Sequence, residues 1–187
     1  MSVWIRHLLV MADRKRTCGE DQQGLTLLEC LATLAIIAIL TAMAVPSFRD
    51  QIADAQARGA ATTLYAAMQF ARSTAQRHGQ VVVLCPMVEI DPEQPQCAGH
   101  FGQRLGAILV SDNGHQLLKA WPPTEGVRVT NRSGVLPVTG RLSWDAWGVG
   151  GRNLTLSVCA DGRNWAVITN RLGRPRLAEG WGQCPAV

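Results

Sequence analysis

The chain has 187 residues, of which 47% are hydrophobic and 17% charged, with a formal net charge of +4 at pH 7. This length corresponds to about one domain, and the composition excludes an intrinsically disordered chain. Apolar residues are concentrated in one stretch, Leu25–Val45, which contains a single charged residue, Glu29. A helix of that length spans about 30 Å, the thickness of a bilayer core. We therefore predict one membrane span, followed by a globular domain.

The segment that precedes the apolar stretch is polar and basic, as a targeting segment is. A secretory signal peptide carries its small-residue cleavage site after the apolar stretch, whereas here the change from polar to apolar residues falls at Gly24. We predict that residues 1–24 are a leader peptide that is cut off at this glycine. Met11 begins a shorter basic leader of the same kind, and we favour it over Met1 as the start.

The residues around this boundary, Gly24-Leu25-Thr26-Leu27-Leu28-Glu29, resemble the class III leader motif of type IV pilins and type II secretion pseudopilins. The resemblance implies that a prepilin peptidase cuts after Gly24 and methylates Leu25, which stands where the family usually has Phe. Counted from Leu25, Glu29 is the fifth residue and Pro46 the twenty-second, as in that family. A carboxylate in an apolar run is costly without a partner, and the resemblance implies the N-terminal ammonium group of a neighbouring subunit as that partner. The alternative is an ordinary signal anchor with a stray glutamate.

The helix is predicted to continue past Pro46 to Arg77, with a kink near this proline. Apolar and small residues recur there at intervals of three and four: Ile52, Ala55, Gly59, Thr63, Ala66 and Phe70. This spacing predicts a stripe that packs on a sheet, and Gly79 is a plausible C-terminal cap. Residues 25–46 would thus form the transmembrane or filament-core half of the helix, and residues 47–78 its amphipathic half.

From Gly79 onward the pattern predicts short strands separated by turns. The expected strands are Val81–Cys85, Leu105–Val110, Gln116–Trp121, Val127–Asn131, Arg141–Trp144, Asn153–Cys159, Trp165–Thr169 and Arg174–Ala178. Ser111–Gly114 contains Asn-Gly and predicts a hairpin turn, because this dipeptide tolerates positive φ. Pro86–Gly99 is expected to be a loop. The predicted class is α+β, with the long helix packed on an antiparallel sheet or small β-sandwich of residues 79–187, as in the type IV pilin fold.

The segment Ala71–Pro86 resembles the end of the long helix and the first strand of the FimT/GspH family of minor pilins and minor pseudopilins. The Asp112-Asn113-Gly114 hairpin and the late Gly173-Arg174-Pro175-Arg176 segment fit the same family. The resemblance implies that the partners are other pilin or pseudopilin subunits. It also implies a single-pass inner-membrane protein whose C-terminal domain lies in the periplasm, and which is incorporated into a pilus or pseudopilus.

Cysteine usage agrees with export. Cys18 falls in the leader and Cys30 in the apolar helix; the domain holds the other four, Cys85, Cys97, Cys159 and Cys184. An even number of cysteines in an exported domain predicts two disulfides. Of the three possible pairings we expect the sequential one, Cys85–Cys97 and Cys159–Cys184. A four-cysteine zinc site would need closely spaced Cys pairs, which the sequence lacks, so we predict no metal.

Arginine is abundant toward the C-terminus. From Cys97 to Val187 there are nine Arg and one Lys against five acids, and Arg163, Arg171, Arg174 and Arg176 fall in the last strand region. The guanidinium group binds phosphate oxygens with a fixed geometry, and Gly173 permits a tight turn before Arg174. In FimT-type minor pilins a C-terminal Gly-Arg-x-Arg motif is linked to DNA binding during natural transformation. The resemblance thus implies DNA binding by these arginines, with little sequence preference; the alternative is a solvated basic turn.

Other chemistry finds little support. The sequence contains no G-x-S-x-G, P-loop, H-E-x-x-H or G-x-G-x-x-G pattern, so we expect neither an enzyme nor a cofactor. Most tryptophans of the domain are expected to pack in its core, but one near Arg174 could stack on bases. Two functional hypotheses remain. One is a DNA-binding minor pilin; the other is a structural minor pilin or type II secretion pseudopilin that primes filament assembly without binding DNA.

Overall fold

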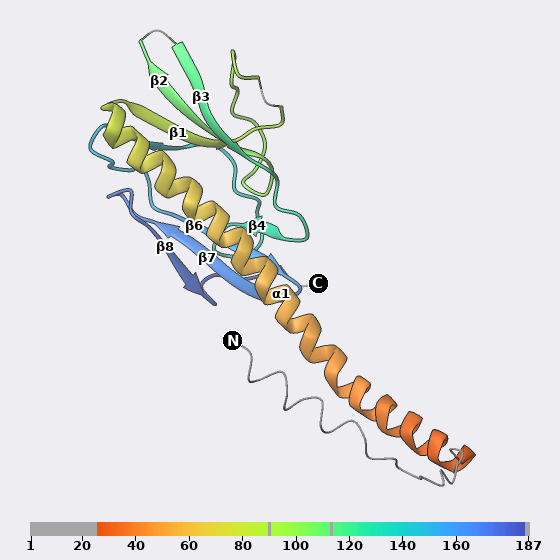
Figure 1. Ribbon diagram of the computed structural model, residues 1–187. Coiled ribbons are helices and arrows are strands. Elements are labelled where there is room, and N and C mark those ends of the chain that lie inside the picture. The colour runs from red at the N-terminus through yellow and green to blue at the C-terminus, as the bar shows by residue number, and fades with distance from the viewer. Residues whose placement is uncertain (1–25, 90, 113, 186–187) are drawn as a thin grey trace, which may run out of the picture. The chain divides into compact units, whose positions relative to one another are not determined.

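A computed structural model of the protein describes residues 26–89, 91–112 and 114–185. Within these ranges it contains one helix and eight strands (Figure 1). The elements are α1 Leu27–His78, β1 Val81–Pro86, β2 Leu105–Ser111, β3 Gly114–Trp121, β4 Arg128–Thr130, β5 Leu142–Trp144, β6 Leu154–Ala160, β7 Arg163–Thr169 and β8 Pro175–Glu179. Each strand overlaps a predicted one. The leader with Gly24 and Leu25, and Asn113 of the predicted hairpin, lie outside the described residues.

The chain divides into two compact units between Met43 and Ala44. The first contains the beginning of α1, where Thr26 caps the helix by accepting a 3.3 Å hydrogen bond on its Oγ1 from the Glu29 N–H. Thr26 thus acts as an N-cap residue, and the negative charge of Glu29 is favourable in the first turn. Among the described residues, α1 is the helix long and apolar enough to cross a membrane. Large side chains such as Leu27 and Leu28 are 80% and 78% exposed, an arrangement that suits lipid or neighbouring subunits better than water.

The second unit begins at Ala44 and contains the rest of α1, whose buried face consists largely of alanines. Its fully or almost fully buried residues are Ala53, Ala57, Ala61, Leu64, Ala67, Met68, Ala71, Thr74 and Ala75. The predicted stripe was wrong in its position: Ile52 is 57% exposed, Ala55, Gly59 and Ala66 are exposed, and Thr63 and Phe70 are only partly buried. Small residues recur at helical spacing on both sides of the helix, and the buried side is the one whose alanines let the backbone approach the sheets while Leu64 and Met68 fill the core. The kink near Pro46 stays a prediction.

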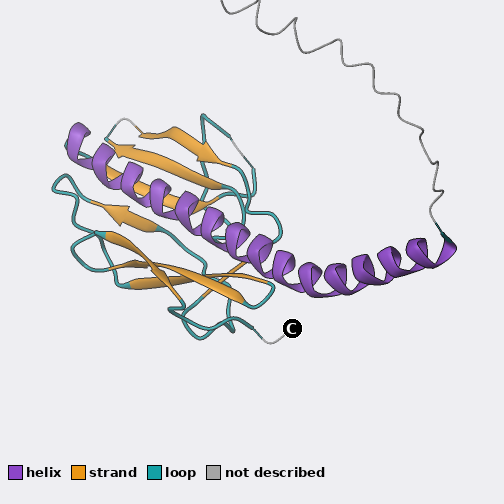
Figure 2. Ribbon diagram, turned by 60° about the horizontal axis from the view of Figure 1, so that its bottom comes forward, coloured by secondary structure: helices purple, strands orange, loops and turns teal. Residues whose placement is uncertain are grey.

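Two four-stranded antiparallel sheets accompany the helix, with strand orders β3-β2-β1-β5 and β4-β6-β7-β8. A single core joins them: Leu64 of α1, Leu84 of β1 and Val158 of β6 all belong to it and are fully buried. Figure 2 shows the second half of α1 running along both sheets. The predicted α+β architecture, a long helix packed on antiparallel strands, is confirmed, with two sheets in the domain.

Two disulfides connect strands to neighbouring loops. Cys85–Cys97 ties β1 to the loop after it, and Cys159–Cys184 ties β6 to the chain beyond β8. This is the predicted sequential pairing. By the chain-entropy account, each link of this loop length stabilises the fold by roughly 3 kcal/mol.

Candidate functional site

The Gly173–Arg176 segment leads into β8, which is the edge strand of its sheet. Gly173 and Pro175 are buried, whereas Arg174 and Arg176 are exposed. In an extended chain alternate residues lie on the same side, so this burial pattern places both guanidinium groups toward solvent. The loop backbone is held by an asparagine side chain, because Asn170 Oδ1 accepts a 3.3 Å hydrogen bond from the Arg174 N–H.

Arg171 lies in the same loop, and its backbone is held from another segment. Its N–H donates a 2.9 Å hydrogen bond to Oδ1 of Asn153, the residue before β6. Its side chain is exposed. The structure therefore gathers Arg171, Arg174 and Arg176 in one loop and the start of one strand, as the sequence predicts.

Gly173 occupies a position that only glycine fits. Its φ is +70°, and an added Cβ would lie 2.5 Å from the Gly148 carbonyl oxygen and 2.7 Å from Trp144 Cδ1. Its carbonyl oxygen accepts a 2.9 Å hydrogen bond from the buried Trp144 Nε1–H. Both the left-handed conformation and the close approach exclude a side chain. The glycine of the predicted motif thus anchors the arginine loop against the domain.

A second loop, residues 145–151, packs against Gly173 and is fixed to α1. Gln76 Nε2 donates a 3.0 Å hydrogen bond to the Trp147 carbonyl oxygen. Arg72 Nε donates a 3.1 Å hydrogen bond to the Gly148 carbonyl oxygen. The Trp147 side chain is nevertheless 78% exposed. Sequence reasoning did not single out this tryptophan, because it is distant from Arg174 in the chain.

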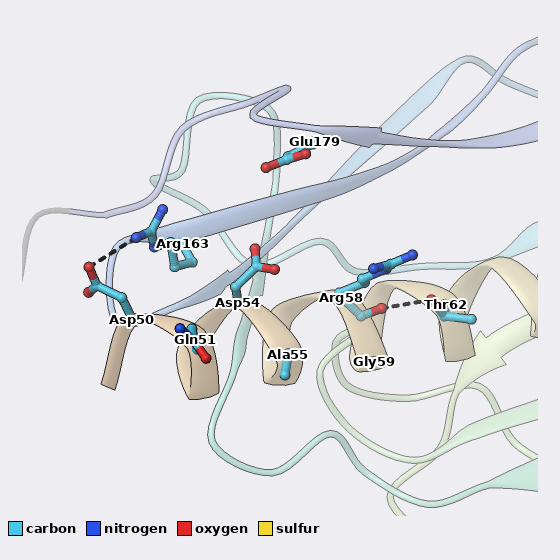
Figure 3. A pocket seen from close by; sticks show the side chains of 9 residues that line it. All are labelled: Asp50, Gln51, Asp54, Ala55, Arg58, Gly59, Thr62, Arg163 and Glu179. Carbon is cyan, nitrogen blue, oxygen red and sulfur yellow. Dashed lines mark hydrogen bonds and ion pairs between the residues drawn. The ribbon is translucent and has the colours of Figure 1, made fainter. Parts of the chain in front are cut away.

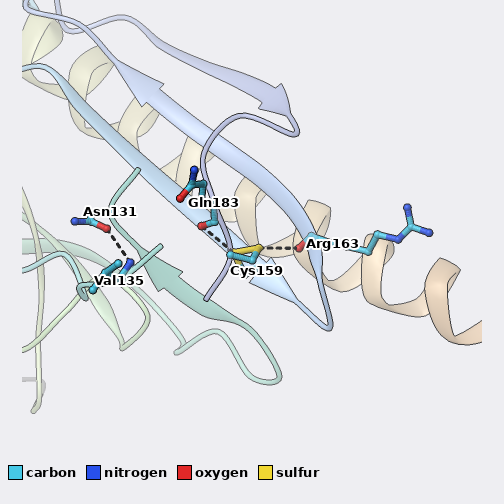
Figure 4. The surroundings of a disulfide bond; sticks show 6 residues. Asn131, Val135, Cys159, Arg163 and Gln183 are labelled. Atoms are coloured by element: carbon cyan, nitrogen blue, oxygen red, sulfur yellow. Dashed lines mark hydrogen bonds between the residues drawn. A yellow bond between two sulfur atoms is a disulfide. The ribbon is translucent and has the colours of Figure 1, made fainter. Parts of the chain in front are cut away.

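Beyond β8, Trp181 contacts two arginines, one in β8 and one in the loop after β4. The guanidinium carbon of Arg132 lies 4.9 Å from the indole ring centroid, and that of Arg176 lies 5.8 Å from it. Such cation–π contacts orient the side chains. The Gln183 N–H donates a 3.0 Å hydrogen bond to the Arg132 carbonyl oxygen, and the Cys159–Cys184 disulfide follows at once (Figure 4). The sequence analysis did not include Arg132 among the candidate site residues, because only the fold brings Arg132 and Arg176 to the same indole ring.

Arg163, which the sequence analysis grouped with the other arginines, lies elsewhere. It begins β7, whereas Arg171 follows the end of that strand. Seven residues of strand separate the two positions by roughly 20 Å. Arg163 Nη2 instead forms a 3.0 Å ion pair with Asp50 Oδ2 (Figure 3), and the two side chains are 49% and 64% exposed. The grouping of Arg163 with the other three arginines was therefore wrong. An extended strand carries residues that are near in sequence far apart in space.

The ion pair borders a polar groove between α1 and the β7–β8 hairpin (Figure 3). The groove is also lined by Asp54, Arg58 and Glu179. Asp54 Oδ1 accepts a 2.9 Å hydrogen bond from Trp165 Nε1–H, and Arg58 lies over the same indole ring. Its acids and arginines nearly balance, so this groove does not favour an anion. In the parts of the chain that the structure describes, no group of three or more His, Cys, Asp or Glu residues could hold a metal ion.

Two parts of the chain match family models. Residues 21–45 match the prokaryotic N-terminal methylation motif, and residues 60–173 match the type II transport protein GspH. The chain belongs to the GspH family. With its methylation motif it is a minor pilin or pseudopilin of a type IV pilus or a type II secretion system. The GspH match ends at Gly173, so Arg174 and Arg176 lie outside the matched residues.

Solved structures of such subunits are similar to the chain at low sequence identity. The type IV minor pilin FimU of Pseudomonas aeruginosa is 20% identical over 65% of this chain and 87% of its own, with a TM-score of 0.49. The minor pseudopilin EpsH of the Vibrio cholerae type II secretion system is 15% identical over 72% of this chain and 99% of its own, also with a TM-score of 0.49. No curated protein matches the chain in sequence.

Proposed function

We propose that this protein is a minor type IV pilin of the pilus and DNA-uptake machinery that binds DNA without sequence preference during natural transformation. The observation that carries the proposal is the turn anchored by Gly173, which leaves Arg174 and Arg176 exposed beside Arg171. Their backbone is fixed, so little ordering free energy is lost when a phosphate binds.

The charges around the turn support an anionic ligand. Residues 131–187 contain seven arginines and three acids, Asp145, Asp161 and Glu179. Asp145 Oδ1 accepts hydrogen bonds from two backbone N–H groups of its own loop. Asp161 and Glu179 lie at the far end of the β7–β8 hairpin, where Glu179 pairs in register with Trp165. The turn itself is therefore positive, and phosphate contacts of this kind position a protein on DNA without distinguishing bases.

The N-terminal part of the proposal concerns assembly. A prepilin peptidase cuts after Gly24 and methylates Leu25, and Glu29 binds the N-terminal ammonium of a neighbouring subunit. The protein is then held in the inner membrane by one helix, with its domain in the periplasm. The methylation-motif match over residues 21–45 and the exposed apolar side chains at the start of α1 support this arrangement.

DNA binding is tested with the full chain in nonionic detergent. Changing Arg174 and Arg176 together to Gln removes two exposed charges at the turn. Binding should weaken several-fold, and the slope of log affinity against log salt should fall by roughly 1 to 2 units. The matched control changes Arg128 and Arg163 to Gln. It removes the same charge from the opposite end of the same sheet. There Arg128 pairs in register with Cys159 of β6, and Arg163 pairs with Ala160.

We expect the control pair to bind DNA with nearly the parent affinity. Cells that carry the Arg174 and Arg176 changes should assemble pili but take up less DNA. If the parent ignores DNA at low salt, or if the Gln variant binds as well as the parent, the second function applies. That function is a structural minor pilin or pseudopilin that primes filament assembly, and the match to a type II transport protein favours it.

A further inference from the structure

We propose that Trp147 is a base-stacking residue, and that it makes the arginine turn a binding site for single-stranded DNA in particular. This inference rests on the proposed function and deepens it. Arginines that contact phosphates treat single and double strands alike. An exposed aromatic ring adds an interaction that only unpaired bases can satisfy, because the faces of paired bases are stacked inside the duplex.

The loop that carries Trp147 is rigidly built. Asp145 Oδ1 accepts hydrogen bonds from the N–H groups of Trp147 at 3.0 Å and Val149 at 2.8 Å. The Asp145 N–H donates to the Val149 carbonyl oxygen at 3.1 Å, and the Gly148 N–H donates to the Asp145 carbonyl oxygen at 2.8 Å. Gln76 holds the Trp147 carbonyl oxygen from the helix. Every backbone polar group at Trp147 is thus satisfied within the domain.

The side chain of Trp147, in contrast, is 78% exposed. Most of its large aromatic surface is therefore open to a ligand, and aromatic side chains contribute strongly to binding when a ligand covers them. Because the backbone at Trp147 is held in place, a ligand that binds the ring does not have to order the loop first. The ring is therefore accessible to a ligand and is not part of the core.

The arginine turn lies against the loop that carries this ring. An added Cβ at Gly173 would meet the Gly148 carbonyl oxygen at 2.5 Å and the Gly150 nitrogen at 2.7 Å, so the two loops are in backbone contact. Trp147 precedes Gly148, and Arg174 follows Gly173. The acid nearest in sequence to Trp147, Asp145, already accepts two backbone N–H groups.

This combination defines the ligand by its chemistry. The positive charge of the turn favours a polyanion. The exposed indole favours a ligand that also carries flat aromatic rings along its chain. Single-stranded nucleic acid has both properties, and stacking platforms flanked by basic residues are the usual means of binding it without sequence preference. An apolar surface of a partner subunit would use the ring but not the arginines.

The test measures the affinity of the full chain, in nonionic detergent, for an oligothymidylate and for a DNA duplex of equal length. Trp147→Ala should weaken single-strand binding by about tenfold, the usual value of one base–aromatic stack, and leave duplex binding unchanged. Trp147→Phe should keep most of the single-strand affinity. Trp147→Leu, which retains apolar bulk without an aromatic face, should behave like Trp147→Ala.

The outcomes separate this inference from the proposal on which it rests. If the parent binds the duplex but Trp147→Ala weakens neither DNA form, or both equally, stacking is overturned while the arginine site stands. A Leu variant as good as the parent would also overturn stacking and indicate a simple apolar contact. A parent that binds neither form overturns the DNA-binding proposal itself, and this inference with it.

Discussion

The indole N–H of Trp144 donates a 2.9 Å hydrogen bond to the carbonyl oxygen of Gly173. Trp144 ends β5, a strand of the first sheet, and is only 1% exposed. Gly173 belongs to the loop between β7 and β8 of the second sheet. The position of the exposed arginines therefore depends on how the two sheets pack, because a core residue of one sheet holds the loop of the other.

Gly173→Ala is predicted to destabilise the domain more than an equivalent change at a glycine in open space. The substitution forces an L-residue to φ +70° and inserts a methyl group against Gly148 and Trp144. Gly162→Ala is the control, with φ +81° and no atom within 4 Å of the added Cβ. We expect a loss of about 1 kcal/mol in the free energy of unfolding for the control and a loss of about 3 kcal/mol for Gly173→Ala. Chemical denaturation measures both losses. If the two variants lose the same free energy of unfolding, the loops around Gly173 accommodate the methyl group without cost, and the prediction fails.

The C-terminal disulfide is predicted to hold Trp181 in place. Changing Cys159 and Cys184 to Ser should lower the free energy of unfolding by roughly 3 kcal/mol. It should also release Trp181, now 41% exposed, from its arginine contacts, so that the tryptophan emission shifts to longer wavelength relative to a Trp181→Phe background. The matched control changes Cys85 and Cys97 to Ser, with a similar loss of stability and no change at Trp181. Peptide mapping of the parent without reduction should find both sequential links; a crossed pairing contradicts the prediction.

Processing is predicted to leave Leu25, methylated on its nitrogen, as the first residue of the mature protein. Intact-mass spectrometry of protein extracted from membranes measures this directly. Replacing Gly24 with a bulky residue should block the peptidase and leave full-length precursor in the inner membrane. A mature N-terminus at Met1, at Met11 or near Pro46 would exclude a pilin-type leader.

The alanine face of α1 is predicted to tolerate no larger side chain. Ala61 is completely buried, so Ala61→Leu should overpack the core and cost about 1–3 kcal/mol. Ala66 is exposed on the same helix, and Ala66→Leu should change the free energy of unfolding by less than about 0.5 kcal/mol. Thermal unfolding of the two variants compares them. A stable Ala61→Leu protein would mean that helix and sheets are not in close contact there.

Local signals predicted the elements well. The helix ends at His78, as a Gly79 cap requires, and Gly79 has a φ of +63°. Alternation of side chains and frequent turns located the strands within a few residues. A single sheet and a small sandwich were both left open, and which strands share a sheet was not predicted, because β5 pairs with β1, far earlier in the chain, instead of with its neighbour β4. Such long-range pairing leaves no local pattern in the sequence.

The candidate site was predicted only where its residues are close in sequence. Arg171, Arg174 and Arg176 lie within one loop and the start of one strand, so the motif located them. Trp147 and Arg132 reach this region by packing of other loops, which no spacing rule reveals. The helix stripe was misplaced for another reason: alanines and other small residues recur at helical spacing on more than one side of α1, so spacing alone does not tell which side faces the sheets.

The Cys159–Cys184 link closes a covalent ring that contains β7, β8 and the arginine loop between them. A pull on a ligand held at Arg174 would act on a point inside this ring. The tension would then divide between two arms, one through β7 and one through β8 and Trp181, which meet at Cys159. Neither strand could be drawn out past the ring without breaking a sulfur–sulfur bond. If the protein acts as proposed in a pilus that retracts under force, the ring would limit how far the loop that binds DNA can unfold when the bound DNA is pulled.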